Sequence, residues 1–368
     1  MGILQMKQWL ILIPALLVCL GGRLTAQDIY TTESIDGVEY VRLSDVCRKY
    51  RLQPVAAKGN MLTYQGEHRV SLRSNHQDFY VNNYRYVLSY PVRMYAGRMM
   101  ISSTDVSKLV DPVLDPKFSA NAGILRTVVI DPGHGGHDAG AVSPYAREKD
   151  CNLAVALKLR KLLRDNGYRV VMTRDSDVFL TLQQRVAIAN RCPDSIFVSI
   201  HHNSGRTAAD GIETFTLAPH GTTSPFARTR RMADLAGNDQ DSENIALATA
   251  VHSRAIKNTK ATDRGIQRAR FSVLCTIKRP AILFEGGFVS NPEEGRRIST
   301  SKYQDILARS IFDGIQGYSS VVCSKRPGSN SRVASGNSSK GRVRTSVSGS
   351  RMGRATIGSP KQKGNKRG

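Results

Sequence analysis

Four short segments of the chain carry histidine or glutamate residues, which can bind a metal ion or transfer a proton. Each candidate lies beside a glycine-rich turn, a predicted strand end or a predicted helix start: His134, Glu148, His201 with His202, and Glu285. A catalytic zinc ion takes three nitrogen or oxygen ligands from the protein and keeps a fourth position for water. The four segments together therefore predict a hydrolytic zinc site.

The elements around these candidates predict an α/β fold. Over residues 122–320, apolar β-branched runs such as 127–130 alternate with helical patterns such as 152–166, whose leucines and alanines recur every three or four residues. This alternation is typical of a largely parallel, twisted sheet with helices on both faces. The other expected strands are 168–173, 196–200, 211–217 and 281–284, and the other expected helices are 183–190, 243–256 and 303–315. Because ligands bind at the carboxyl ends of such strands, His134, His201 and Glu285 are expected at one edge of the sheet.

Spacing leaves several choices open among the candidates. His137 lies close to His134, although in the loop after the turn, and His201 and His202 point to opposite sides if their strand continues through both. The turn at 133–136 does not match the dinucleotide-binding pattern, because Asp138 stands where a third glycine or alanine is required. Composition alone does not choose between His201 and His202.

The two glutamates are equally ambiguous on position alone. Glu148 precedes a predicted helix, where the helix dipole favours any acidic residue, and Asp150 has the same claim. Glu285 ends an apolar strand before two glycines, and a buried carboxylate there is costly unless it is paired, metal-bound or catalytic. Whether Glu285 is a ligand or a base stays open at this point.

Most of residues 126–318 resemble the zinc-dependent N-acetylmuramoyl-L-alanine amidases, which cut stem peptides from peptidoglycan glycans. The matching residues are Asp131 to Gly136, Glu148, Thr173-Arg174, Arg185, Ala189-Asn190, Ser199 to His201, Asn203, Asp263 to Gly265, Glu285, Gly287-Phe288 and Ser290-Asn291. The resemblance implies hydrolysis of the amide between N-acetylmuramic acid and L-alanine, for cell-wall remodelling or daughter-cell separation. It implies His134, Glu148 and His201 as zinc ligands and Glu285 as the catalytic carboxylate. His202 departs from the family, which usually carries a small residue there.

Residues 27–121 predict a separate small α+β domain with a binding or spacer role. Residues 37–46 and 97–106 repeat one pattern at an offset of 60 residues, and each copy predicts a hairpin turn, a strand and the start of a helix. Further strand-like pieces lie at 70–72 and 79–81. The segment loosely resembles the N-terminal module of copper amine oxidases.

The first 26 residues read as a signal peptide. A basic Lys7 is followed by an apolar run over 9–20 and a candidate cleavage site at 24–26. The run is shorter than the roughly 20 residues that span a bilayer, which favours a cleaved signal over an anchor. The expected location is outside the cytoplasm, in the periplasm or cell envelope.

Residues 324–368 predict a disordered basic tail. Serine, glycine, lysine and arginine dominate it, and it has neither acidic nor aromatic residues, so it cannot bury enough apolar surface to fold. Its twelve basic residues supply about half of the formal net charge of +23. Anionic envelope polymers or lipid headgroups are the expected partners besides peptidoglycan, with a merely solubilising tail as the alternative. No nucleic acid is expected, since the tail cannot stack on bases and the chain carries an export signal. The oligomeric state stays open.

Overall fold

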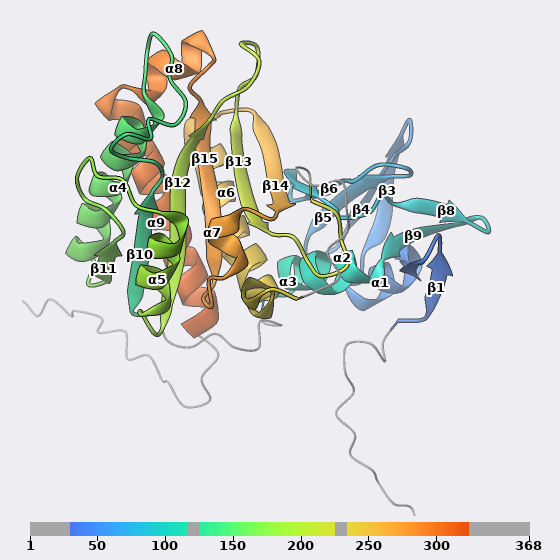
Figure 1. Ribbon diagram of the computed structural model, residues 1–368. Coiled ribbons are helices and arrows are strands. Elements are labelled where there is room, and N and C mark those ends of the chain that lie inside the picture. The colour runs from blue at the N-terminus through green and yellow to red at the C-terminus, as the bar shows by residue number, and fades with distance from the viewer. Residues whose placement is uncertain (1–29, 117–124, 225–233, 324–368) are drawn as a thin grey trace, which may run out of the picture. The chain divides into compact units, whose positions relative to one another are not determined.

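The computed structural model describes residues 30–116, 125–224 and 234–323, which Figure 1 shows in colour. The predicted signal peptide and the predicted tail at 324–368 lie outside these residues. In the described ranges, no helix combines the length and the apolar character needed to cross a membrane.

The N-terminal region contains the predicted repeat. Two hairpins turn at residue pairs with positive φ, Asp36-Gly37 and Ala96-Gly97. Their strands are β1 (Thr32–Ile35) with β2 (Val38–Arg42), and β8 (Arg93–Tyr95) with β9 (Arg98–Ser102). A helix follows each inner strand, α1 (Leu43–Lys49) or α2 (Ser103–Asp105), and β2 pairs antiparallel with β9. The predicted hairpin, strand and helix start are therefore present in both copies.

The remaining N-terminal strands form an antiparallel series. They are β3 (Gln53–Lys58), β4 (Met61–Gln65), β5 (Arg69–Arg73), β6 (Asp78–Val81) and β7 (Tyr84–Val87), of which only β5 and β6 were expected. The π-helix η2 (Val106–Val110) and α3 (Asp111–Leu114) follow α2. Strand β7 then pairs with β14 of the C-terminal region through Tyr86 and Ile266. The sheet thus continues from one predicted domain into the other, and their bounds at residues 121 and 122 stay a prediction.

Six strands form the part of the sheet that carries the candidate residues. They are β10 (Thr127–Pro132), β11 (Arg169–Met172), β12 (Ser195–Asn203), β13 (Ile212–Leu217), β14 (Asp263–Ala269) and β15 (Ala281–Phe288), in the order β11-β10-β12-β15-β13-β14. Every neighbouring pair is parallel except β13 with β15, so the predicted largely parallel sheet is confirmed. Strand β14 was not predicted, because its many charged and polar residues hide the usual strand pattern.

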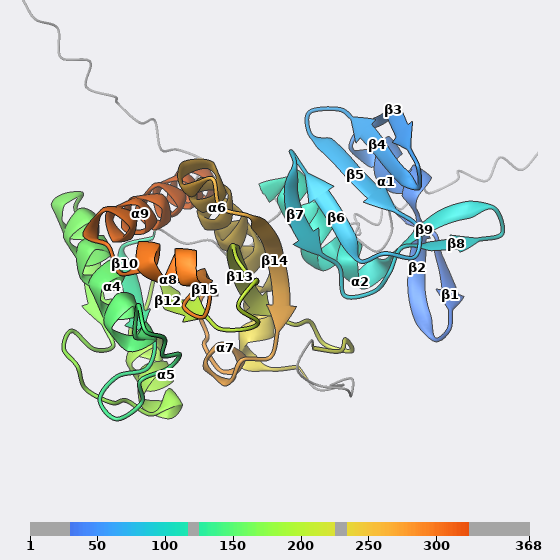
Figure 2. The ribbon, with the colours of Figure 1, turned by 90° about the horizontal axis from the view of Figure 1, so that it is seen from above.

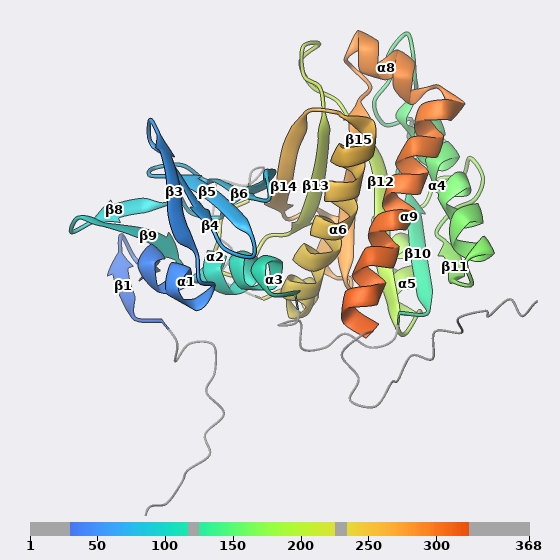
Figure 3. The same cartoon turned by 180° about the vertical axis from the view of Figure 1, so that it is seen from behind.

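Helices cover both faces of this sheet, as predicted (Figure 2). On one face lie α4 (Glu148–Asp165), α6 (Asp241–Thr259) and α9 (Ser301–Cys323), which pack side by side (Figure 3). On the other lie α5 (Leu182–Asn190) and α7 (Ser272–Cys275). Alternating residues of β10 explain the two layers, because Val128 and Ile130 join the larger core with the first group of helices, whereas Val129 joins the core of α5 and α7. The 3₁₀ helix η4 (Ala236–Gln240) precedes α6, and α8 (Pro292–Ile298) follows β15.

Helix α4 starts earlier than the periodicity predicts. Its first residue is Glu148 rather than a residue near Asn152, and it ends at Asp165, just before the positive-φ Gly167. The first turn was missed because its charged residues carry no apolar repeat, although buried contacts hold it. Glu148 therefore lies in the helix, not before it.

Candidate metal centre

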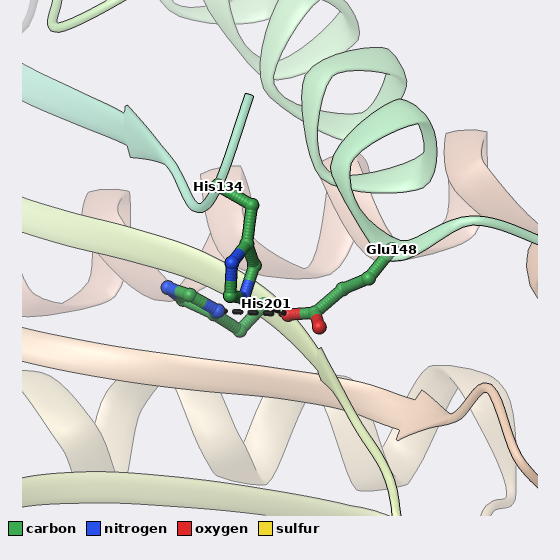
Figure 4. A group of neighbouring side chains, drawn as sticks. All are labelled: His134, Glu148 and His201. Carbon is green, nitrogen blue, oxygen red and sulfur yellow. Dashed lines mark hydrogen bonds and ion pairs between the residues drawn. The ribbon is translucent and has the colours of Figure 1, made fainter. Parts of the chain in front are cut away.

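Three of the predicted site residues converge where β10, β12 and α4 meet (Figure 4). The Oε1 atom of Glu148 lies 3.1 Å from Nε2 of His134 and 2.8 Å from Nδ1 of His201. One ligand atom from each residue lies within 4.8 Å of the other two. The two imidazole rings meet edge to face, with centroids 5.0 Å apart. Residues from three distant segments thus present two nitrogens and one oxygen to a common point.

The turn that carries His134 is tight because of its glycines. His134 itself has a φ of 59° and follows directly after β10 and Gly133. A Cβ atom on Gly133 would lie 2.1 Å from the His201 ring, and one on Gly140 would lie 2.5 Å from Oε2 of Glu148. Side chains at either position would therefore occupy the space of the candidate ligands.

A second set of contacts orients these side chains. Asp138 Oδ2 lies 2.8 Å from Nδ1 of His134, which leaves Nε2 facing Glu148. The backbone N–H of Ala141 donates to Oε2 of Glu148 over 2.8 Å, and Nδ2 of Asn152 donates to its Oε1 over 3.4 Å. Partners of this kind fix the ring orientation and basicity of metal-binding residues.

Buried ionic contacts hold the end of β10 under the site. Asp131 accepts hydrogen bonds from Thr173, Arg185 and Ser199, over 2.6, 2.8 and 2.8 Å. Arg185 also donates to the carbonyl of His134, and the buried guanidinium of Arg174 donates to the carbonyls of Pro132, Gly133 and Lys149. Both arginines therefore support the turn, since their N–H groups donate to its carbonyl oxygens.

The electrostatics of the cluster suit a cation. Burial raises the pKa of Glu148, but the hydrogen bonds from His134 and His201 outweigh it and hold the pKa well below its ordinary value. Burial lowers the pKa of His134, but the contacts with Glu148 and Asp138 raise it by more, so the pKa lies above its ordinary value. Two histidines thus compete for one carboxylate oxygen. A divalent ion would bond all three donors at once, and two imidazoles with one carboxylate are a known ligand set of catalytic zinc.

Glu285 lies beside the cluster in a different environment. In the sheet register it stands opposite His201 on β12 and opposite Glu213 on β13. It is 9% exposed, and within the described ranges its buried Oε2 atom has no hydrogen-bond partner. Burial, followed by repulsion from Glu148 and Glu213, raises the pKa of Glu285 well above its ordinary value. A carboxyl group with a raised pKa holds a proton more readily than an exposed glutamate does, which suits a group that takes up and releases a proton during a reaction.

The other sequence candidates do not join the group of three. Strand β12 continues through His201 and His202, and the buried His202 ring bonds Asn152 through Nδ1 over 2.8 Å. Burial lowers the pKa of His202 to about 4, so its ring is neutral. His137 stacks on Phe179, and Asp150 pairs with Arg147. Sequence reasoning missed the supporting roles of Asp138, Asn152 and Asp131, although Asp138 follows His134 by only four residues.

Comparison with known proteins gives the family of the chain. A model of the N-acetylmuramoyl-L-alanine amidase family, Amidase_3, matches residues 128–317, which is more than half of the chain and includes all four candidate residues. The chain belongs to this family.

Named relatives carry the same description. N-acetylmuramoyl-L-alanine amidase AmiC of Escherichia coli O6:H1 is 35% identical over 242 residues, and the match covers 58% of each protein. AmiA of Escherichia coli K12 is 32% identical over 229 residues, which cover 55% of this chain and 79% of the relative. The catalytic domain of CwlV, an N-acetylmuramoyl-L-alanine amidase from Bacillus (Paenibacillus) polymyxa var. colistinus, is 36% identical. That alignment covers 53% of this chain and 99% of the domain, with a TM-score of 0.46.

Proposed function

We propose that the protein is a zinc-dependent hydrolase of the amide bond between N-acetylmuramic acid and L-alanine in peptidoglycan. The observation that carries this proposal is the convergence of donor atoms from His134, Glu148 and His201 beside Glu285. The Oε2 atom of Glu285 is buried and has no partner in the part of the chain that the structure describes. The three converging residues would hold the zinc ion, and Glu285 would transfer the proton. Family membership supplies the substrate class.

The residues of the chain divide the reaction between them. Bound zinc would lower the pKa of the attacking water and polarise the carbonyl of the scissile amide. Oε2 of Glu285 accepts the proton that the water loses, and the same oxygen then returns it to the amine of L-alanine as that amine departs. A carboxyl group with a raised pKa suits both steps, because it is a stronger base than an ordinary glutamate and still releases its proton to the departing amine. Asp138 keeps the proton of His134 on Nδ1, which leaves Nε2 free to bind metal.

The competing function is that of a wall-binding protein that keeps the fold without turnover. Such a protein has no use for a complete set of ligands, nor for a buried carboxylate oxygen without a partner, which costs stability. The described residues include three converging donor side chains and such an oxygen, and these two features favour an enzyme.

Product analysis tests the proposal. The purified protein is incubated with peptidoglycan after zinc loading, after chelation, and after chelation followed by added zinc. Mass spectrometry should find new L-alanine amino ends in the first and third samples only. Glu285→Gln should release almost none, whereas Glu67→Gln, a change at an exposed glutamate on the turn after β4, should match the wild type. Equal release with and without chelator, or from Glu285→Gln, would contradict the proposed chemistry.

The same proposal places the protein in the periplasm or cell envelope, where its substrate lies, with a role in wall remodelling or daughter-cell separation. The basic segment 324–368 would add attraction to anionic envelope polymers or lipid headgroups. Wall binding of the full chain is compared with that of a variant ending at Cys323, over a range of salt concentrations. The full chain should bind more tightly at low salt, and identical, salt-independent binding would remove the role of this segment.

A further inference from the structure

A β-bulge places Arg264 on the edge of the site that lies beyond Glu285. In the parallel pair of β13 and β14, Ile212 stands opposite Asp263, and Glu213 stands opposite Gly265. Arg264 is the extra residue between these two pairs. Bulges redirect a side chain and are frequent beside active sites. The backbone accommodates this bulge with a φ of 96° at Gly265, and Arg85 donates to the carbonyl of Arg264 over 2.5 Å.

The side chain of Arg264 is anchored at one end. Its Nε donates to Oε1 of Glu213 over 2.5 Å, and its guanidinium lies 4.9 Å from the centroid of the Phe288 ring. The other oxygen of Glu213, Oε2, accepts a hydrogen bond from Asn203 over 2.9 Å. Both oxygens of this buried glutamate therefore accept a hydrogen bond, and Glu213 supports Arg264.

The outer half of the guanidinium is free. Among the described residues, neither terminal nitrogen of Arg264 has a hydrogen-bond partner, and its side chain is 37% exposed. The terminal nitrogens of Arg174 and Arg185, by contrast, donate to buried carbonyl and carboxylate oxygens. A fixed guanidinium with a free terminal fork is the group that binds a carboxylate through two parallel hydrogen bonds.

The register gives the distance from the strand of His201 to Glu213, the residue that holds Arg264. His201, Glu285 and Glu213 are successive partners across β12, β15 and β13, so their side chains lie on one face of the sheet. Two strand spacings are about 10 Å, which is the length of about three extended residues. A peptide whose first amide lies between His201 and Glu285 would therefore reach Arg264 within its first few residues.

We propose that Arg264 binds a carboxylate of the substrate peptide, on the alanine side of the scissile amide. This assignment rests on the proposed function, because the peptide is the leaving group of that reaction. The side chain makes the enzyme prefer stem peptides with a free carboxylate close after L-alanine over peptides in which that group is a carboxamide.

A pair of synthetic substrates tests the assignment. They are N-acetylmuramoyl peptides that differ only in a carboxylate or a carboxamide on the residue after L-alanine. The zinc-loaded wild type should have a kcat/KM about 10- to 100-fold higher for the acid, the range of a charged hydrogen bond. Arg264→Gln should lose this preference mainly through a higher KM for the acid, with little change for the amide.

Two further variants keep the result interpretable. Arg264→Lys retains the charge beside Glu213 without the bidentate fork, and it should recover only part of the preference. Arg254→Gln, a change at an exposed arginine of α6, should behave as the wild type. Equal rates on both substrates in the wild type, or an unchanged preference in Arg264→Gln, would overturn the assignment. Cleavage of neither substrate by the wild type would overturn the proposed function itself and this assignment with it.

Discussion

Glu148 and Glu285 are both buried glutamates at the same end of the sheet, but their surroundings are opposite. Glu148 has hydrogen-bond partners on both oxygens, and its histidine neighbours hold its pKa low. Glu285 has an oxygen without a partner among the described residues, and burial together with nearby carboxylates raises its pKa. A carboxylate that keeps its charge suits a cation, whereas one that gains and loses a proton suits catalysis. The comparison teaches that the environment, not the residue type, separates the two roles.

Replacing each glutamate in turn gives the largest expected effect and tests the comparison directly. Glu285→Gln should lower kcat by about 10²- to 10⁴-fold, the usual contribution of a general base. Its zinc content should stay that of the wild type, because the three residues proposed to bind zinc are unchanged. Glu148→Gln should lose activity together with zinc. Metal analysis after gel filtration separates the two variants. Loss of zinc from Glu285→Gln would contradict the separate roles of the two glutamates.

The buried charges under the His134 turn predict the next effect, on stability. Asp131→Ala leaves the buried guanidinium of Arg185 without its carboxylate, and removing one partner of a buried ion pair costs about 3–5 kcal/mol. Urea denaturation should show this as a lower free energy of unfolding. Asp165→Ala, which breaks an exposed pair with Lys161, should change the value by less than about 1 kcal/mol. If Asp131→Ala lowered the free energy of unfolding as little as Asp165→Ala does, the Asp131 contacts would not stabilise the site.

The contact between Asp138 and His134 predicts a smaller effect, on the affinity of the site for zinc. Asp138→Asn removes the carboxylate that orients the ring, and losses of such supporting residues weaken metal binding by about 10- to 100-fold. Competition with a fluorescent zinc chelator measures the affinity. Asp175→Asn, at an exposed pair with Arg160, is the matched control and should bind zinc like the wild type. Unchanged zinc affinity in Asp138→Asn would show that Asp138 does not support metal binding.

His202 gives the smallest expected effect on metal binding. Its ring bonds Asn152 and lies outside the group of three, so His202→Ala should retain the wild-type ratio of zinc to protein. The variant leaves a cavity, because the His202 side chain that it removes is buried. Its melting temperature should therefore fall while its zinc content does not. A ratio of zinc to protein that falls by half in His202→Ala would contradict this expectation and indicate that His202 takes part in metal binding.

Local sequence predicted much of the fold because strands and helices leave short-range patterns. The β-branched run of β10, the apolar repeat of α4 and the paired hairpin turns were all visible, and the carboxyl ends of parallel strands are a known place for ligands. Strand β14 was missed because it is held by pairing with β13 and β7 rather than by an apolar pattern of its own. Strand pairing joins residues far apart in the chain, so no local window contains it.

For the site, the sequence by itself determined the chemical types, the order of the four segments and, through the family resemblance, the expected roles. Tertiary structure decided which atoms meet. It turned His201 toward Glu148 and His202 toward Asn152, and it gave Glu148 partners that Glu285 lacks. It also placed Arg264 at a bulge, with its side chain partly exposed. The physical reason is that burial, hydrogen-bond partners and strand register depend on neighbours supplied by other segments, which only the folded chain brings together.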